Sequence, residues 1–241
     1  MDQAEFNTRL VAALERWQPE LGEAEQAEKA RKKAESDATA ARIKRIEKVS
    51  AASRSNWFWF FGVLAYAVIT IMGLEDRAFF TGGAETKLPI LNFSVDFTWF
   101  VVLAPALIAV VYGYLHNLIE QLWQDLADLP PTGDDGLAIS AQLPVWLLID
   151  FALSLRGWLR PKESPSSHFS PLGIMGSLGI ALLIWAAGPA VVAVYWAKAA
   201  IVHAPVPVLL NGAFFFYCLL TAWLSASSLV LSMLPDPEAD T

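Results

Sequence analysis

The sequence predicts an all-α integral membrane protein with four transmembrane helices, an N-terminal cytoplasmic helical arm and one cytoplasmic interfacial helix. Three observations lead to this fold class. Hydrophobic residues make up 55% of the 241 residues, whereas soluble domains have about 45–50%. The apolar residues form long runs with almost no charge, while most Lys and Arg lie in the first 56 residues. Aromatic residues, including ten Trp and fourteen Phe, cluster at the edges of these runs, as they do in interfacial belts.

Residues 1–56 are predicted to form the cytoplasmic arm, with a break near Pro19. A proline inside a helix costs about 3 kcal/mol but suits a first helical turn, so a second helix should begin near Pro19. Alanines recur mostly three or four residues apart after this point, and alanine has the highest helix propensity. This weak stripe fits either a thin coiled coil with another copy of the chain or a solvated helix that continues into the membrane. The segment Ser50–Asn56 either caps a new helix or lies inside a continuous one.

Residues 57–234 are predicted to form a four-span membrane domain. About 20 apolar residues cross a hydrocarbon core of roughly 30 Å. The runs of suitable length are 57–74, 97–115, 172–196 and 206–234. We expect the second run to continue as an amphipathic helix to residue 129, and Pro105 and Pro189 to kink the second and third spans. Residues 235–241 are expected to form an acidic tail.

Two segments between these runs are unsuited to a crossing. The polar loop after the first span contains 87–90 and 93–96, which predict a small extracytoplasmic hairpin around Leu91–Asn92 that Pro89 restricts to a sheet edge. Residues 143–159 are apolar but contain Asp150 near their middle. A carboxylate at the bilayer centre costs about 3 kcal/mol, so we predict an interfacial helix here instead of a fifth span.

The distribution of Lys and Arg predicts the orientation of the chain. With four spans and a cytoplasmic N-terminus, fourteen of the 17 basic residues lie inside and three outside, in agreement with the positive-inside rule. Both termini of a multi-pass inner-membrane protein are therefore expected in the cytoplasm. The arm contains ten acidic and eleven basic residues, so we expect no nucleic-acid partner. The lipid bilayer is the expected environment, and the basic clusters of the arm are suited to anionic lipid.

The first candidate functional residues are His116 and Glu120, which stand one helical turn apart at the cytoplasmic end of the second span. Histidine titrates near neutral pH, so the two residues are candidates for a pH or cation sensor. An ordinary i,i+4 pair on an interfacial helix face is the simpler interpretation.

Two further sets of residues are candidates for packing surfaces. The expected helix-packing residues, small or hydrogen-bonding, are Gly173, Gly176, Ser177, Gly179 and Asn211. The amphipathic end of the second span would leave an apolar patch in water unless another element covers it. The residues expected at this cytoplasmic interface are Leu118, Leu122, Trp123, Leu126 and Asp150.

The sequence contains none of the catalytic or nucleotide-binding motifs that we sought. The P-loop, HExxH, GxSxG and GxGxxG patterns are absent. The single cysteine, Cys218, lies within an apolar run, and no predicted span carries a charged residue at its centre. We therefore expect a protein without enzymatic activity, cofactor or metal.

The stretches FFTGGAETKLPILNFSV, FVVLAPALIAVVYGYLHNLIEQLWQDLADLP and IWAAGPAVVAVYW resemble the N-terminal four-span membrane domain of bacterial pentapeptide-repeat membrane proteins and their relatives. The features that carry the resemblance are Leu88–Ile90, Pro105, Tyr112–His116 and Leu122–Pro130. It covers roughly residues 56–196, and no pentapeptide repeats follow in this sequence. The resemblance implies a bacterial inner-membrane module and assigns no chemistry to any residue.

Together these features predict a non-enzymatic protein that forms a homo-oligomer in the membrane. We expect it to change membrane permeability, as a pore-forming effector of a bacterial stress or antiphage (antiviral) defence system would. The alternative is a membrane anchor that recruits a separately encoded cytosolic protein. A small-molecule carrier is a third expectation, which the uncharged spans do not favour.

Overall fold

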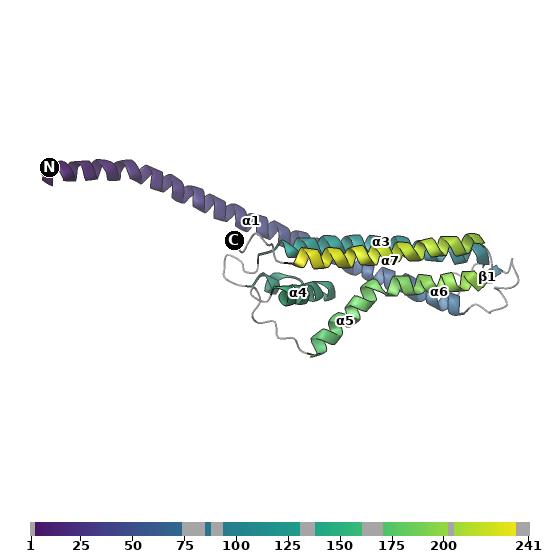
Figure 1. Cartoon of the computed structure of the whole chain (residues 1–241). Helices are drawn as coiled ribbons and strands as arrows, with labels where there is room; N and C mark the ends of the chain where they lie inside the picture. Colours follow the sequence, from purple (N-terminus) through teal and green to yellow (C-terminus); the bar gives the residue numbers. More distant parts are fainter. Residues whose placement is uncertain are drawn as a thin grey trace.

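In the computed structural model one helix, α1 (Gln3–Met72), forms both the arm and the first membrane-type helix. Its 70 residues extend about 105 Å at 1.5 Å per residue, and its N-terminal part projects far beyond the other helices (Figure 1). The backbone is described for residues 3–73, 85–87, 94–130, 138–160, 171–201 and 205–234. Side chains are described for 25–73, 99–130, 138–140, 142–160, 173–201 and 205–234.

Helix α1 runs through the two places where the sequence indicated a possible change. The predicted break near Pro19 is wrong, because α1 is continuous from Gln3 to Met72. A proline removes one backbone hydrogen bond, and the alanine-, glutamate- and lysine-rich residues after it favour the helix strongly enough to continue it. The segment Ser50–Asn56 also lies inside α1, where the Ser53 hydroxyl donates to the Ser50 carbonyl at 2.9 Å. Arm and first span are therefore one uninterrupted helix.

Helix α3 (Phe97–Ala127) is the centre of the bundle and packs against α1, α6 (Ala187–Ile201) and α7 (Pro205–Met233). Asn211 Nδ2 on α7 donates to the Val101 carbonyl on α3 at 3.2 Å. At the other end of the same pair, Ser228 Oγ donates to Glu120 Oε1 at 2.7 Å. Because both residue numbers increase together, α3 and α7 run parallel. Aromatic contacts between Phe60 and Tyr112 and ion pairing between Arg45 and Asp125 show that α1 runs antiparallel to α3.

A short hairpin precedes α3. Strand β1 (Glu85–Lys87) pairs antiparallel with β2 (Ser94–Asp96), with Glu85 opposite Asp96 and Lys87 opposite Ser94. The second strand lies within its predicted range, whereas the first lies earlier than the predicted 87–90. Proline has no N–H to donate to a ladder, which agrees with a first strand that ends before Pro89. The predicted turn at Leu91–Asn92 lies outside the described residues.

The bundle has two distinct ends, which we name by their contents. At the arm end, the C-terminal ends of α3 and α7 lie beside α4 (Leu147–Leu159), and the arm extends from here (Figure 1). At the hairpin end, β1 and β2 adjoin the start of α3 (Figure 1). A 3-10 turn, η1 (Ile139–Gln142), precedes α4, so the helix predicted for 143–159 begins only at Leu147.

The third predicted span, 172–196, is not one helix. Helix α5 (Pro171–Trp185) and α6 are separated at Ala186 and bent by 45° relative to each other. Helix α5 leaves the bundle, while α6 stays in it and continues to Ile201 (Figure 1). The bend lies one turn before Pro189. The ring of a proline crowds the carbonyl four residues earlier, here that of Trp185, and so breaks the helix.

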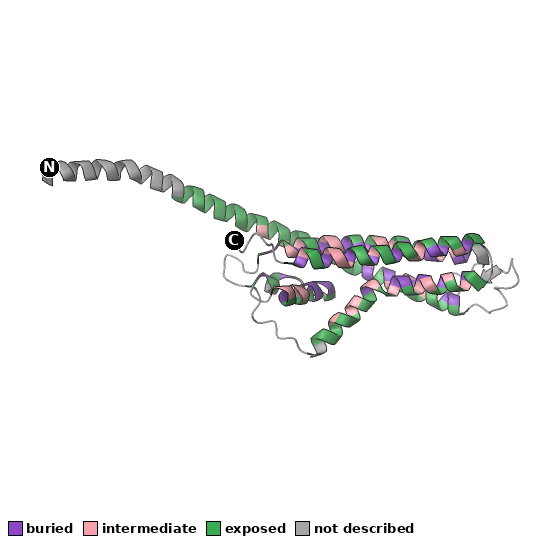
Figure 2. Ribbon diagram, viewed as in Figure 1, coloured by how far each residue is buried: buried purple, intermediate pink, exposed green. Residues whose placement is uncertain are grey.

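Among the described residues, three helices are long and apolar enough to cross a membrane: Glu25–Met72, Trp99–Ala127 and Pro205–Met233. The bent pair α5 and α6 makes a fourth if it counts as one span. Large apolar side chains are exposed on the outer faces of these helices, and exposed residues alternate with buried ones along the bundle (Figure 2). The fold is thus that of a helical, multi-pass membrane protein.

Candidate functional site at a broken span

The break between α5 and α6 leaves a backbone carbonyl without its helical partner. Regular bonds flank it, with the Ala186 N–H donating to the Leu182 carbonyl at 2.9 Å and the Ala190 N–H to the Ala186 carbonyl at 2.9 Å. The Trp185 carbonyl would accept from residue 189, but residue 189 is a proline and has no N–H. Unpaired carbonyls cost several kcal/mol in hydrocarbon, so another part of the chain must bind them.

Two neutral side chains of α3 contact carbonyls at the break. Tyr112 donates its hydroxyl to the Trp185 carbonyl at 3.1 Å, and His116 Nε2 lies 3.2 Å from the Ile184 carbonyl. A carbonyl only accepts, so the proton of His116 is on Nε2. The opposite nitrogen, Nδ1, is buried without a hydrogen-bond partner among the described residues. Tyr112 and His116 are four residues apart and therefore share one face of α3, and their ring centroids are 4.3 Å apart.

Gly188 creates the space for Tyr112 beside the break. A Cβ atom at position 188 would lie 2.6 Å from Tyr112 Cδ2 and 2.8 Å from Cε2. Tyr112 is fully buried, so its ring has no free space into which it can move. The glycine is needed here for close approach of α6 to α3 and not for an unusual backbone angle.

Three aromatic rings close the arm side of the break. Trp123 of α3, Phe151 of α4 and Trp185 of α5 form a triangle with centroid distances of 6.3, 6.2 and 6.0 Å. Such tilted and edge-on pairs are favourable beyond their buried area. The triangle joins three helices at one level, so α4 and the beginning of the bend are held to the same part of α3.

The two residues of the predicted sensor do not act together in this geometry. His116 contacts α5 through the Ile184 carbonyl, whereas Glu120 accepts from Ser228 of α7. Gln124 Nε2 also donates to Glu120 Oε1, at 3.4 Å. The i,i+4 partner that His116 contacts is Tyr112, one turn in the other direction.

The apolar residues of the predicted cytoplasmic interface are covered by the chain itself. Each of the four is buried, and Trp123 contacts Phe151 of α4. These residues are Leu118, Leu122, Trp123 and Leu126. Asp150 lies on α4 but is exposed, and its partial burial raises the pKa of the carboxyl group above the ordinary value of 3.8. Helix α4 therefore covers this part of α3.

The predicted helix-packing residues have different surroundings. Asn211 is buried and bonded to α3. Gly176 and Gly179 of α5 have no described atom within 4 Å of a Cβ built on them, and Gly173 and Ser177 lie on the same helix, exposed and half-buried respectively. Among the described residues, the small face of α5 therefore makes no close contact at Gly176 or Gly179.

Arginines at the arm end bind the last carbonyls of two helices, a feature that the sequence reasoning missed. On α3, Arg42 donates to the Asp128 carbonyl at 2.8 Å and Arg156 to the Leu126 carbonyl at 3.1 Å. Arg160 donates to the carbonyls of Met233 and Leu234 at the end of α7, at 2.9 and 2.6 Å. Cations are favourable at helix C-termini. The available signal in the sequence was the position of Arg156 in the last turn of an apolar helix and of Arg160 directly after it.

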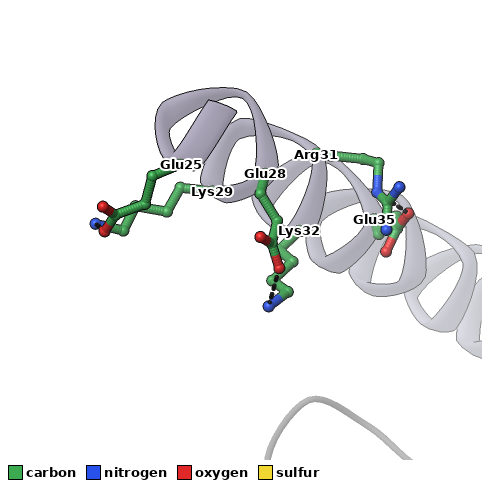
Figure 3. A network of polar contacts seen from close by, with 6 residues as sticks. All are labelled: Glu25, Glu28, Lys29, Arg31, Lys32 and Glu35. Atoms are coloured by element: carbon green, nitrogen blue, oxygen red, sulfur yellow. Dashed lines mark hydrogen bonds and ion pairs between the residues drawn. The ribbon is translucent and has the colours of Figure 1, made fainter. Parts of the chain in front are cut away.

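The exposed part of the arm is supported by ion pairs along one helix. Three pairs lie four residues apart, with N–O distances of 2.6, 2.8 and 3.3 Å (Figure 3). They join Glu25 to Lys29, Glu28 to Lys32 and Arg31 to Glu35. These fully solvated pairs support the helix locally and do not attach it to the bundle.

No group of three or more His, Cys, Asp or Glu residues in the described part of the chain could hold a metal ion. Cys218, the single cysteine, is buried. A scan against protein-family models found no match, and searches of curated proteins and of solved structures also found none. The resemblance to the membrane domain of pentapeptide-repeat proteins therefore stays a prediction.

Proposed function

We propose that this chain is a non-enzymatic, self-associating protein of the bacterial inner membrane whose output is a change in membrane permeability. Such an activity belongs to effectors of bacterial stress and antiphage defence. The observation that carries the proposal is the broken span. Helix α5 is uncharged and is bent by 45° from α6, and the neutral side chains of Tyr112 and His116 contact carbonyls at its end.

The lengths of the two halves support a crossing by α5 and α6 together. Helix α6 has 15 residues and extends about 22 Å, which is short of a hydrocarbon core of roughly 30 Å. Helix α5, also of 15 residues, adds about 16 Å along the axis of α6 when it is inclined at 45°. Part of α5 would therefore lie in the hydrocarbon, and a change in its angle would alter how the bundle fills the membrane.

The charge distribution supports an arm end in the cytoplasm. Arg42, Arg45, Arg156 and Arg160 all contact this end of the bundle, as the positive-inside rule requires of a cytoplasmic face. Because α3 and α7 both finish here, four crossings would place both termini in the cytoplasm. The hairpin would then lie on the opposite side.

The continuity of α1 supports a link between the arm and the membrane domain. No loop separates the exposed residues of the arm from those that pack on α3. Binding or assembly on the arm would therefore tilt or shift the first span directly. An arm joined by a flexible linker could not transmit such a displacement.

Induced expression in bacterial cells with a potential-sensitive dye tests the proposal. We expect depolarisation on induction, and we expect Pro189→Ala to reduce it because an N–H at position 189 favours a straight span. Purified protein in nanodiscs should contain more than one copy by mass photometry. A strictly monomeric protein that leaves the membrane potential unchanged would refute the proposal.

A membrane anchor is the second candidate, favoured by the exposed arm around Glu25–Lys48. A long solvated helix offers a docking surface for a cytosolic partner. Capture of one stoichiometric partner that requires residues 3–49, without depolarisation on induction, would select the anchor over the permeability effector.

A further inference from the structure

Helix α4 is short, yet it contacts four other helices. Its 13 residues extend about 20 Å. Two arginines at its end bind the last turns of α3 and α7, with Arg156 donating to the Leu126 carbonyl and Arg160 to the Met233 carbonyl. Its remaining contacts, with α1 and α5, lie nearer its start, and these are the ones that concern the broken span.

The start of α4 is held against α1 by Trp146, the residue directly before the helix. The ring centroid of Trp146 lies 6.5 Å from that of Trp57 and 6.5 Å from that of Phe58. The Arg54 guanidinium lies 5.0 Å from the centroid of the Trp146 ring, and Arg54 also donates to the Val145 carbonyl at 3.5 Å. A cation over an indole face is attracted to it. The place where the arm enters the membrane domain is therefore attached to α4.

The middle of α4 contacts the end of α5. Phe151 is buried, and its ring centroid lies 6.0 Å from that of Trp185 on α5. Phe151 follows Trp146 by only five residues, which a helix spans in about 7.5 Å. The Trp146 carbonyl accepts from the N–H groups of Ile149 and Asp150, both at 2.9 Å, so the two aromatic residues are joined by hydrogen-bonded helix. A shift of α1 at Trp146 would therefore reach Trp185 over a short and rigid path.

The buried part of α5 is its end beside the break. Ile184 is fully buried, whereas residues 173–179 are exposed except for the half-buried Ser177. At Trp185 the carbonyl accepts from Tyr112 and the ring contacts α4. A helix that is held at one end turns about that end. A small displacement of Trp185 would therefore become a larger one at the beginning of α5, about 20 Å away along the helix.

We propose that α4 couples the arm to the broken span. Because α1 is one continuous helix, a displacement of the arm moves Arg54 and Trp57. Helix α4 carries this movement to Trp185 and so changes the angle of α5. The inference rests on the proposed function for its output, and it names the element through which the arm would regulate the break.

Hydrogen exchange of the full chain in nanodiscs, followed by mass spectrometry, tests this coupling. Arg54→Ala removes an exposed side chain that contacts α4. We expect amides of residues 173–185 to exchange about two- to fivefold faster, the range that corresponds to loss of one exposed cation–π contact, while amides of α7 keep their rates. Lys48→Ala is the matched control, because it removes an exposed cation six residues earlier on the same helix. It should leave the exchange of α5 unchanged.

A double-mutant comparison distinguishes coupling from a general loss of stability. In a Phe151→Leu background the contact between α4 and α5 is already weakened, so Arg54→Ala should have no further effect on residues 173–185. Trp185→Leu removes the other ring of the same contact and gives the same comparison if Phe151→Leu does not fold. An equal effect of Arg54→Ala with and without Phe151, or an equal effect of Lys48→Ala, overturns the proposal.

The coupling and the permeability function can fail separately. Depolarisation on induction together with additive effects on exchange would leave the permeability function standing and remove the coupling through α4. Non-additive effects on exchange without depolarisation would leave the coupling standing and remove the permeability function.

Discussion

The hydrogen bond from Tyr112 to the Trp185 carbonyl should matter only because residue 189 is a proline. Tyr112→Phe removes a donor from the part-buried Trp185 carbonyl, which has no N–H from residue 189 to replace it. Leaving such a group unpaired costs about 1–3 kcal/mol. In a Pro189→Ala background the backbone of residue 189 gains an N–H that can bond to the same carbonyl. Tyr112→Phe should then cost only the net value of one hydrogen bond, about 0.5–1 kcal/mol.

The expected coupling between the two substitutions is therefore about 0.5–2 kcal/mol in a double-mutant cycle. Reversible unfolding in detergent, followed by tryptophan fluorescence, measures it. Tyr195→Phe is the matched control, because the Tyr195 hydroxyl donates at 2.9 Å to the Ala67 carbonyl inside the unbroken helix α1. That carbonyl keeps its helical partner, so Tyr195→Phe should cost less and should not depend on residue 189. Equal costs for Tyr112→Phe with and without Pro189 would refute the account of the break.

Three further outcomes follow from the same structure. Gly188→Ala should destabilise the protein by about 1–3 kcal/mol through overpacking against Tyr112, whereas Gly176→Ala, which meets no atom within 4 Å, should be neutral or stabilising in thermal unfolding. Leu122→Asp should abolish folding, seen as loss of monodisperse protein in size-exclusion chromatography, because it places a charge at a fully buried position; a folded but unassembled variant would contradict this. Burial raises the pKa of Asp150, so its contribution to stability should fall as pH rises through the window above 3.8, and Asp150→Asn should remove this fall from the pH profile of the melting temperature.

The membrane helices could be predicted because length and lack of charge are enough to define them. The predicted runs 57–74, 97–115 and 206–234 correspond to the end of α1 up to Met72, to α3 and to α7 up to Met233, and α3 continues past its apolar part as its amphipathic pattern indicated. In each case the local sequence carries the signal. The hydrogen-bonding need of the backbone in hydrocarbon leaves the helix as the only local solution.

The features that sequence reasoning missed depend on contacts between distant segments. Pro189 indicated a bend. The direction in which α5 leaves the bundle depends on contacts from Tyr112 and His116 to carbonyls about 70 residues away in the chain. Pro19 indicated a break that does not occur, because a local rule was given more weight than the propensity of the surrounding helix. The amphipathic pattern indicated that another element must cover Leu122 and Trp123, but it did not identify α4, whose Phe151 contacts Trp123.

His116 shows why a pattern of residue types is a weak guide to chemistry inside a membrane. Its spacing from Glu120 resembles a sensor pair, but the same spacing links it to Tyr112, and the latter pair is the one in contact. A break caused by a proline leaves carbonyls that need donors, and a neutral imidazole beside a phenol supplies them without introducing a charge. The break therefore accounts for a histidine at this position before any titration is considered. It follows that the angle of α5 depends on His116, while the packing of α3 on α7 depends on Glu120, so the two residues control different parts of the bundle.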